Sequence, residues 1–132
     1  QKMSKSYHNT IELFEPNGSI KKKVMGIVTD SKTMEEPKEP EGNSIYELYK
    51  LFATPEEVAA MAASFRAGNY GYGHAKKALL EAYHRLFDPF RARREELAKD
   101  PAALEDILAE GAKKARAAAA PIMNKVREAV GL

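Results

Sequence analysis

Side chains that alternate between apolar and polar, the pattern of a half-buried β-strand, nowhere run long enough in this 132-residue chain to predict a strand. Apolar residues instead recur at helical spacing, and proline and glycine separate the helical stretches. We therefore predict an all-α fold in which several helices pack as a small bundle. The length is that of one ordinary domain.

The first helix is expected directly after the sequence EPNGS. Ile20, Val24, Ile27 and Val28 fall at i, i+4, i+7 and i+8, which places them on one apolar stripe. The lysines at 21–23 crowd its first turns, where the helix dipole disfavours cations. We therefore expect these lysines to serve something other than the helix.

Two further helix starts carry capping signals. In TPEE, Thr54 is predicted as the N-cap, Pro55 as the first helical residue and Glu57 as the third. In SIYE, Ser44 stands three residues before Glu47, which predicts a capping box. Before these starts, the acidic and proline-rich residues 31–43 suit neither helix nor strand and are predicted to be a linker.

The second half of the chain predicts two long helices. RAGNYGYGH breaks the helical pattern, and a helix follows from about 73 to 99 that Pro89 should kink or split. Asp100 and Pro101 then start a last helix that runs almost to the C-terminus, with Gly111 and Pro121 as its weak points. The predicted core residues of the helical region are Phe65, Leu79, Leu86, Phe87, Phe90, Ile107 and Leu108.

Composition excludes several classes of protein. The chain has no cysteine, so disulfide scaffolds and cysteine-ligated zinc sites are excluded. No apolar run approaches the roughly 20 residues that span a bilayer, and no secretory signal is visible, so we expect a cytoplasmic protein without a membrane partner. The histidines 8, 74 and 84 lack carboxylate or histidine partners at ligand spacing, which argues against a metal site.

The chemistry is concentrated at the N-terminus, where Lys2, Met3, Ser4, Lys5 and Ser6 spell KMSKS. Two ammonium groups three residues apart on a loop can converge on one polyphosphate, and serine hydroxyls and loop amides can add hydrogen bonds. Such a loop could stabilise the charge that develops on a leaving pyrophosphate. A lysine- and serine-rich terminus that is merely solvated is the alternative.

The sequence around this motif resembles a known family. KMSKSYHNTIELF is similar to the second ATP-binding motif of class I aminoacyl-tRNA synthetases, in the version found in tryptophanyl-tRNA synthetases. KKKVMGIVTDS, LYKLFATPEE, GYGHAKKAL, RLFDPFRARREEL and the C-terminal stretch resemble successive later pieces of that family. The resemblance covers essentially the whole chain in order. His8 departs from it, because the family often has asparagine there.

The resemblance implies a function and a set of site residues. The family activates tryptophan with ATP and Mg²⁺, transfers it to tRNA(Trp), and works as a homodimer. Lys2 and Lys5 would contact the ATP phosphates as catalytic residues, Met3 would lie near the adenine side, and Ser4 and Ser6 would support a flexible loop. No metal ligand is expected from this chain.

The same resemblance implies that the chain is the C-terminal part of such an enzyme, because the Rossmann-type half with the tryptophan pocket and the first ATP motif is absent. A first residue of Gln1 also suggests a natural start upstream. We expect residues 1–16 to form the catalytic loop and its connector, and 17–132 the helical tRNA (anticodon)-binding region. The isolated chain should be inactive. The alternatives are a stand-alone, synthetase-derived helical module that binds RNA or protein without catalysis, and a structural domain without a ligand.

Basic and aromatic residues of the helical region are candidates for tRNA contacts. Tyrosines at 70 and 72 could stack on bases or pack at a helix–helix corner. Lys76 and Lys77 fall in the first turn of the helix expected from about 73, where the dipole argues against a purely stabilising role, and they could contact the tRNA backbone. Two further clusters could contact phosphate or remain a solvated face, and these are Arg91, Arg93 and Arg94, then Lys113, Lys114 and Arg116.

Overall fold

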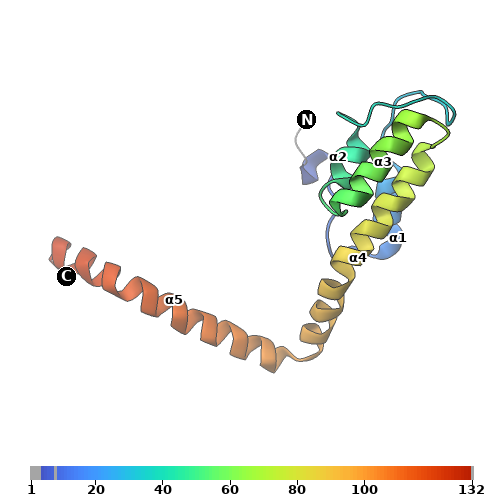
Figure 1. Cartoon of the computed structure of the whole chain (residues 1–132). Helices are drawn as coiled ribbons and strands as arrows, with labels where there is room; N and C mark the ends of the chain where they lie inside the picture. Colours follow the sequence, from blue (N-terminus) through green and yellow to red (C-terminus); the bar gives the residue numbers. More distant parts are fainter. Residues whose placement is uncertain (1–3, 8, 132) are drawn as a thin grey trace. The chain divides into compact units, whose positions relative to one another are not determined.

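The computed structural model describes residues 4–7 and 9–131, with Lys5 described by its backbone alone. Every regular element in these residues is helical, which confirms the all-α prediction. The first element is the 3-10 turn η1 (Lys5–Tyr7). The α-helices, labelled in Figure 1, are α1 (Asn17–Met25), α2 (Ser44–Tyr49), α3 (Pro55–Ala67), α4 (Tyr72–Lys99) and α5 (Pro101–Val130). No helix of this described part is both long and apolar enough to cross a membrane.

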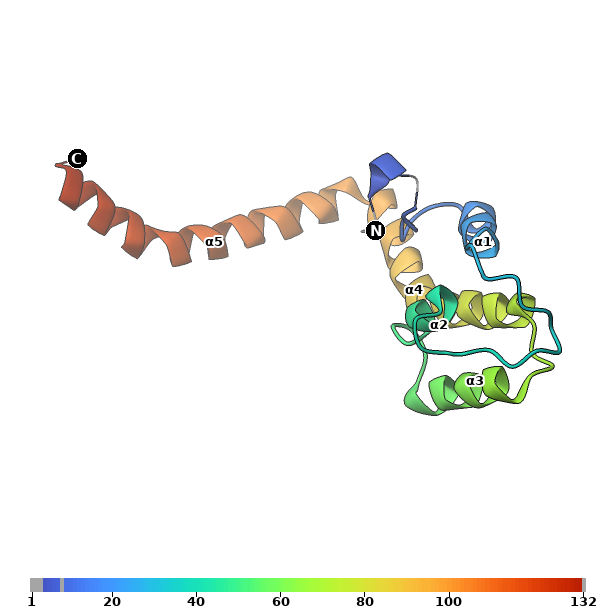
Figure 2. The same cartoon turned by 90° about the horizontal axis from the view of Figure 1, so that it is seen from above.

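The chain forms two compact units, Gln1–Arg91 and Ala92–Leu132, and the boundary between them falls inside α4. In the first unit, α1, α2 and α3 gather around the first part of α4, as Figures 1 and 2 show. In the second unit, α5 has no buried residue.

The buried face of α4 organises the first unit. Ala75, Leu79, Ala82 and Tyr83 recur at i, i+4, i+7 and i+8 and are all buried. The helices α1, α2 and α3 add the rest of the core, which is Ile20, Val24, Ile45, Tyr46, Tyr49, Met61, Ala62 and Phe65. The predictions for Phe65 and Leu79 are confirmed, and Phe87 packs against this core half-buried, 4.8 Å from Tyr83 between ring centroids.

Other predicted core residues are exposed. Leu86 is 40% and Phe90 60% exposed, and in α5 Ile107 is 52% and Leu108 64% exposed. These predictions were wrong because helical spacing shows which residues share a face, whereas burial also needs a partner element over that face. Among the described residues of the second unit, 92–131, none packs over α5 closely enough to bury one of its side chains.

The helix boundaries correct two further predictions. Helix α1 ends at Met25 with Gly26 as its C-cap, so Val28 lies beyond the expected stripe and is 87% exposed. The N-cap of α2 is Asn43, whose side chain accepts hydrogen bonds from the amides of Ile45 and Tyr46. Ser44 is instead the first helical residue, so the predicted capping box at Ser44 was wrong.

The remaining predicted boundaries hold. Thr54 and Glu57 form the capping box of α3, with Pro55 at its first position. Asp100 caps α5 by accepting from the amide of Ala103 at 3.0 Å. Pro89 lies inside α4 without splitting it, and α5 likewise runs through its own predicted weak points, Gly111 and Pro121.

The break between α3 and α4 requires a glycine. Gly68 has φ +79°, and a Cβ on it would lie 2.4 Å from the carbonyl oxygen of Glu35. Both the left-handed backbone and this close approach exclude a side chain. The turn is thereby held against residues 31–43, which contain no regular element.

A buried lysine organises that irregular segment. Lys38 is only 2% exposed, and its Nζ donates to the carbonyl oxygens of Thr33 at 2.6 Å, Met34 at 3.3 Å and Glu36 at 2.9 Å. The ammonium also lies 5.3 Å from the centroid of the Tyr72 ring. One buried cation therefore ties together three backbone acceptors of residues 33–36.

Replacing Lys38 tests this arrangement. Lys38→Met should lower the free energy of unfolding by about 2–4 kcal/mol, because three partly buried carbonyls lose a charged donor. Lys32→Met is the matched control, since Lys32 makes one exposed hydrogen bond to the carbonyl of Pro37, and it should change stability by less than about 0.5 kcal/mol. Urea unfolding of the three proteins measures both values, and equal losses for the two variants would contradict the role of Lys38.

Candidate functional site

The described part of the KMSKS motif forms a small closed turn. The amide of Tyr7 donates to the carbonyl of Ser4 at 3.0 Å within η1. The Ser4 amide donates to Oδ1 of Asn9 at 2.8 Å, and the Ser4 hydroxyl oxygen accepts from the amide of Ser6 at 3.3 Å. These contacts bring Ser4 and Ser6 together. Lys2, Met3, His8 and the side chain of Lys5 lie outside the described residues, so the assigned ATP contacts stay predictions.

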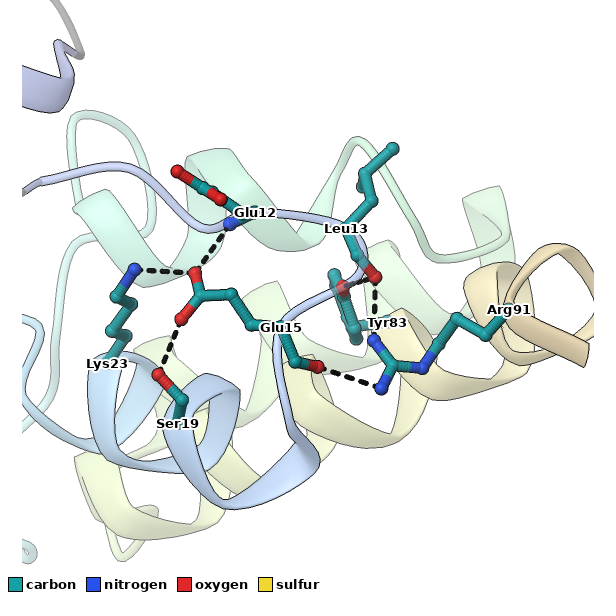
Figure 3. A network of polar contacts seen from close by, with 7 residues as sticks. All are labelled: Glu12, Leu13, Glu15, Ser19, Lys23, Tyr83 and Arg91. Atoms are coloured by element: carbon teal, nitrogen blue, oxygen red, sulfur yellow. Dashed lines mark hydrogen bonds and ion pairs between the residues drawn. The ribbon is translucent and has the colours of Figure 1, made fainter. Parts of the chain in front are cut away.

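The segment that follows the motif is held by α4 through its backbone (Figure 3). Arg91 donates from Nη1 to the carbonyl of Leu13 at 2.6 Å and from Nη2 to the carbonyl of Glu15 at 2.8 Å. The hydroxyl of Tyr83 donates to the same Leu13 carbonyl at 3.1 Å. Two side chains of α4 therefore fix the turn at residues 13–15. Because they bond backbone carbonyls, these contacts do not depend on which side chains the turn carries.

The carboxylate of Glu15 holds the segment to α1. It accepts from Nζ of Lys23 and from the hydroxyl of Ser19, each at 2.5 Å, and from the amide of Glu12 at 2.8 Å. The bond from Lys23, then those from Ser19 and Glu12, lower the pKa of Glu15 from 4.5 to about 2. Lys23 thus serves the motif-bearing segment. Lys22 and Lys23 lie in the last turn of α1, where the helix dipole favours cations, so the prediction that these lysines crowd its first turns was wrong.

A groove of about 860 Å³ lies beside this segment. Its polar lining includes Asn9, Ser19, Lys22 and Lys23, and its apolar lining includes Ile11 and Leu48. Figure 3 shows the Lys23 side chain turned toward Glu15. One of the two lysines that line the groove is therefore paired with a carboxylate of the same chain. The groove can accept a ligand that combines negative charge with an apolar part.

Several residues considered for tRNA contact have structural partners. The Nζ of Lys76 donates to the carbonyls of Met25 and Ile27, both at 2.8 Å, and so supports the C-terminal end of α1. The argument that the dipole leaves Lys76 without a stabilising role was therefore wrong, because it considered only the residue's own helix. Arg91 is likewise committed to backbone carbonyls.

The aromatic corner packs inward. Tyr70 and Tyr72 lie 5.6 and 5.9 Å from the ring of Phe65 between centroids. The Tyr72 hydroxyl donates to Oδ1 of Asp30 at 2.7 Å, and burial together with this bond raises the pKa of Tyr72 to about 12. The packing interpretation of these tyrosines is the one that the structure supports.

His84 has a carboxylate partner, so the prediction that the histidines lack one was wrong for this residue. Nδ1 of His84 lies 3.0 Å from Oδ1 of Asp88, one helical turn away. Sequence spacing of i, i+4 on a helix would have revealed the pair. No group of three or more potential metal ligands occurs among the described residues.

Comparison with known proteins places the motif and its anchoring helices in a family. Residues 1–88 match the model of the tRNA synthetases class I (W and Y). The chain belongs to this family. It is 52% identical over 132 residues to a tryptophan–tRNA ligase of Rhodopirellula baltica, in a match that takes in 100% of this chain and 41% of that relative. A tryptophan–tRNA ligase of Fusobacterium nucleatum is 47% identical, with 100% and 40% covered.

A solved structure extends the similarity to the fold. The crystal structure of tryptophanyl-tRNA synthetase from Campylobacter jejuni, complexed with ADP and tryptophan, is 40% identical to this chain with a TM-score of 0.86. The match covers 99% of this chain and 41% of that one. The predicted resemblance to tryptophanyl-tRNA synthetases is thus confirmed, and the chain spans about two fifths of the length of these synthetases.

The Glu15 contacts predict a specific response to acid. Because the folded-state pKa of about 2 lies below the ordinary value of 4.5, ionised Glu15 stabilises the fold above about pH 4.5, and this contribution is lost as the pH falls toward 2. Glu15→Gln should therefore lower the melting temperature at pH 7, and its difference from wild type should shrink below about pH 4.5.

Thermal unfolding followed from pH 7 to pH 2 measures this difference. Glu81→Gln, which changes an exposed carboxylate of α4, is the control and should follow the wild type throughout. A Glu15→Gln deficit that is the same at every pH would show that the carboxylate's charge is not what stabilises the segment.

Proposed function

We propose that this chain supplies the ATP-binding loop and the tRNA-binding helices of a cytoplasmic tryptophan–tRNA ligase. The observation that carries the proposal is the 52% identity to a tryptophan–tRNA ligase over the whole chain, KMSKS motif included. The Campylobacter jejuni synthetase, complexed with ADP and tryptophan, supports the choice of nucleotide and amino acid.

In this proposal the loop acts by electrostatics. When tryptophan is activated with ATP, negative charge accumulates on the departing pyrophosphate, and fixed cations lower the barrier by stabilising that charge. Lys2 and Lys5 would supply two ammonium groups to the phosphates, and Met3 would lie on the adenine side. Ser4 and Ser6 would hold the loop in its closed turn, as their mutual contact suggests. Mg²⁺ would enter with ATP as part of the substrate.

The helical region would bind tRNA(Trp) in this proposal. Lys77 is exposed on α4, and Lys113, Lys114 and Arg116 are exposed on α5, where Lys113 pairs with Glu110 at 2.6 Å. Exposed cations of this kind can contact RNA phosphates, and their binding weakens as salt rises. We propose the homodimer of the family as the working assembly.

Lys5 provides the direct test of the loop. In the full-length natural protein, Lys5→Ala should lower tryptophan-dependent ATP–pyrophosphate exchange by about 100-fold, because it removes charge stabilisation of the transition state. If the wild type is active and Lys5→Ala matches it, the role of Lys5 is wrong. If no amino acid supports exchange by the wild type, a non-catalytic module that binds RNA or protein replaces the proposal.

The isolated 132-residue chain should be inactive in the same assay. The chain spans only 41% of a tryptophan–tRNA ligase, and its resemblance to the family assigns the tryptophan pocket to the other part. Tryptophan-dependent exchange by this chain alone, at a rate above that of a heat-denatured sample, would contradict the proposal that the tryptophan pocket belongs to the other part of the enzyme.

A further inference from the structure

We propose that Arg91 is a positioning residue for the ATP-binding loop, holding the motif-bearing segment in register with α4. The inference rests on the proposed function, since it assigns Arg91 an effect on the use of ATP. Arg91 is not expected to touch the nucleotide. It would act by fixing the backbone from which the KMSKS turn projects.

The geometry of the guanidinium is the first support. Its two terminal nitrogens bond two different carbonyls, those of Leu13 and Glu15, at 2.6 and 2.8 Å. A planar fork that bonds two acceptors at once fixes their orientation as well as their position. The Arg91 side chain is 17% exposed, so these bonds are partly shielded from competing water.

The surroundings of Arg91 are built to hold it. Nε lies 3.7 Å from Oδ1 of Asp88 on the preceding turn of α4. Tyr83, two turns earlier on the same helix, is buried in the core and donates to the Leu13 carbonyl that Arg91 also bonds. Figure 3 shows both side chains reaching this carbonyl from α4. The segment is therefore tied to the helix that carries the core.

The other side of the segment is tied to α1. The backbone carbonyl of Glu15 accepts a hydrogen bond from Arg91, and its carboxylate accepts hydrogen bonds from Lys23 and Ser19. One residue of the segment that follows the motif thus links two helices. If either tie is lost, the loop can tilt relative to the helices, and a misplacement of about 1 Å can cost a reaction about 100-fold in rate.

Arg91 is not part of the hydrophobic core. Arg91→Ala takes no apolar side chain out of the core, and the Tyr83 hydroxyl still has the Leu13 carbonyl as its acceptor, so the loss should appear in the placement of the loop more than in the stability of the fold. This separates a positioning role from a purely structural one.

The experiment compares variants of the full-length protein in tryptophan-dependent ATP–pyrophosphate exchange. Arg91→Ala should lower kcat/KM for ATP by about 10-fold, which is a tenth of the roughly 100-fold loss expected when a reactive group is itself misplaced. The dissociation constant for tryptophan, measured without ATP, should stay at the wild-type value. Arg66→Ala is the matched control, because Arg66 is an exposed arginine of the same unit that pairs with Glu41 at 2.9 Å, and it should match wild type.

A double variant tests whether Arg91 acts through the loop lysine. If it acts through Lys5, Lys5→Ala and Arg91→Ala combined should lose about as much as Lys5→Ala alone, roughly 100-fold, because the Lys5 ammonium that Arg91 positions is already gone. Losses that multiply to about 1,000-fold would show independent effects and would overturn the inference. Wild-type ATP parameters for Arg91→Ala, or an equal loss of tryptophan affinity, would overturn it too.

The two proposals fail in different ways. An active wild type with an unaffected Lys5→Ala variant removes the function assigned to the loop and, with it, any positioning role for Arg91. Only the positioning role is removed if Lys5→Ala loses activity while Arg91→Ala keeps wild-type ATP parameters. The same holds if the losses of the two variants multiply in the double variant.

Discussion

The buried face of α4 is the constraint on which the rest of the first unit depends. Its four apolar side chains give α1, α2 and α3 a common surface to pack against. The same helix then presents Lys76, Tyr83 and Arg91 to backbone carbonyls of residues far away in the sequence. Because these polar groups stand on a rigid, buried support, they can hold loops whose own residues bury little. The segment beside the KMSKS motif owes its position to a helix that begins many residues later.

Much of the helical architecture could be predicted from local signals. Proline at the first helical position and a polar cap before it located the starts of α3 and α5, because both signals act through the backbone of adjacent residues. The cap of α2 was misplaced by one residue, since Asn43 and Ser44 are both good caps and tertiary context selects between them. The exposed Phe90 and Ile107 show the limit of periodicity, which identifies an apolar face but not whether another element covers it.

The candidate site divides in the same way. The ATP contacts of Lys2 and Lys5 stay predictions. The motif and its family could be recognised from the sequence, because KMSKS is contiguous and the surrounding sequence resembles one family. The supports of the site could not, because Glu15, Lys23 and Arg91 come from three separated stretches. In the sequence, Lys23, Lys76 and Arg91 are members of basic clusters. In the fold, each of them donates a hydrogen bond to an acceptor within the chain. Where a cation's partner is a carbonyl, no complementary acidic residue exists in the sequence to reveal it.

The buried ammonium of Lys38 has a consequence for the chemical reactivity of the surface. An amine acylates through its free lone pair, and an ammonium that donates to three carbonyls within the fold offers neither that lone pair nor access to a reagent. Lys32, a few residues earlier, makes a single exposed bond from its ammonium group and is open to a reagent. Amine-reactive reagents will therefore discriminate between two lysines of one short segment, and the modification of Lys38 will report how often that segment opens.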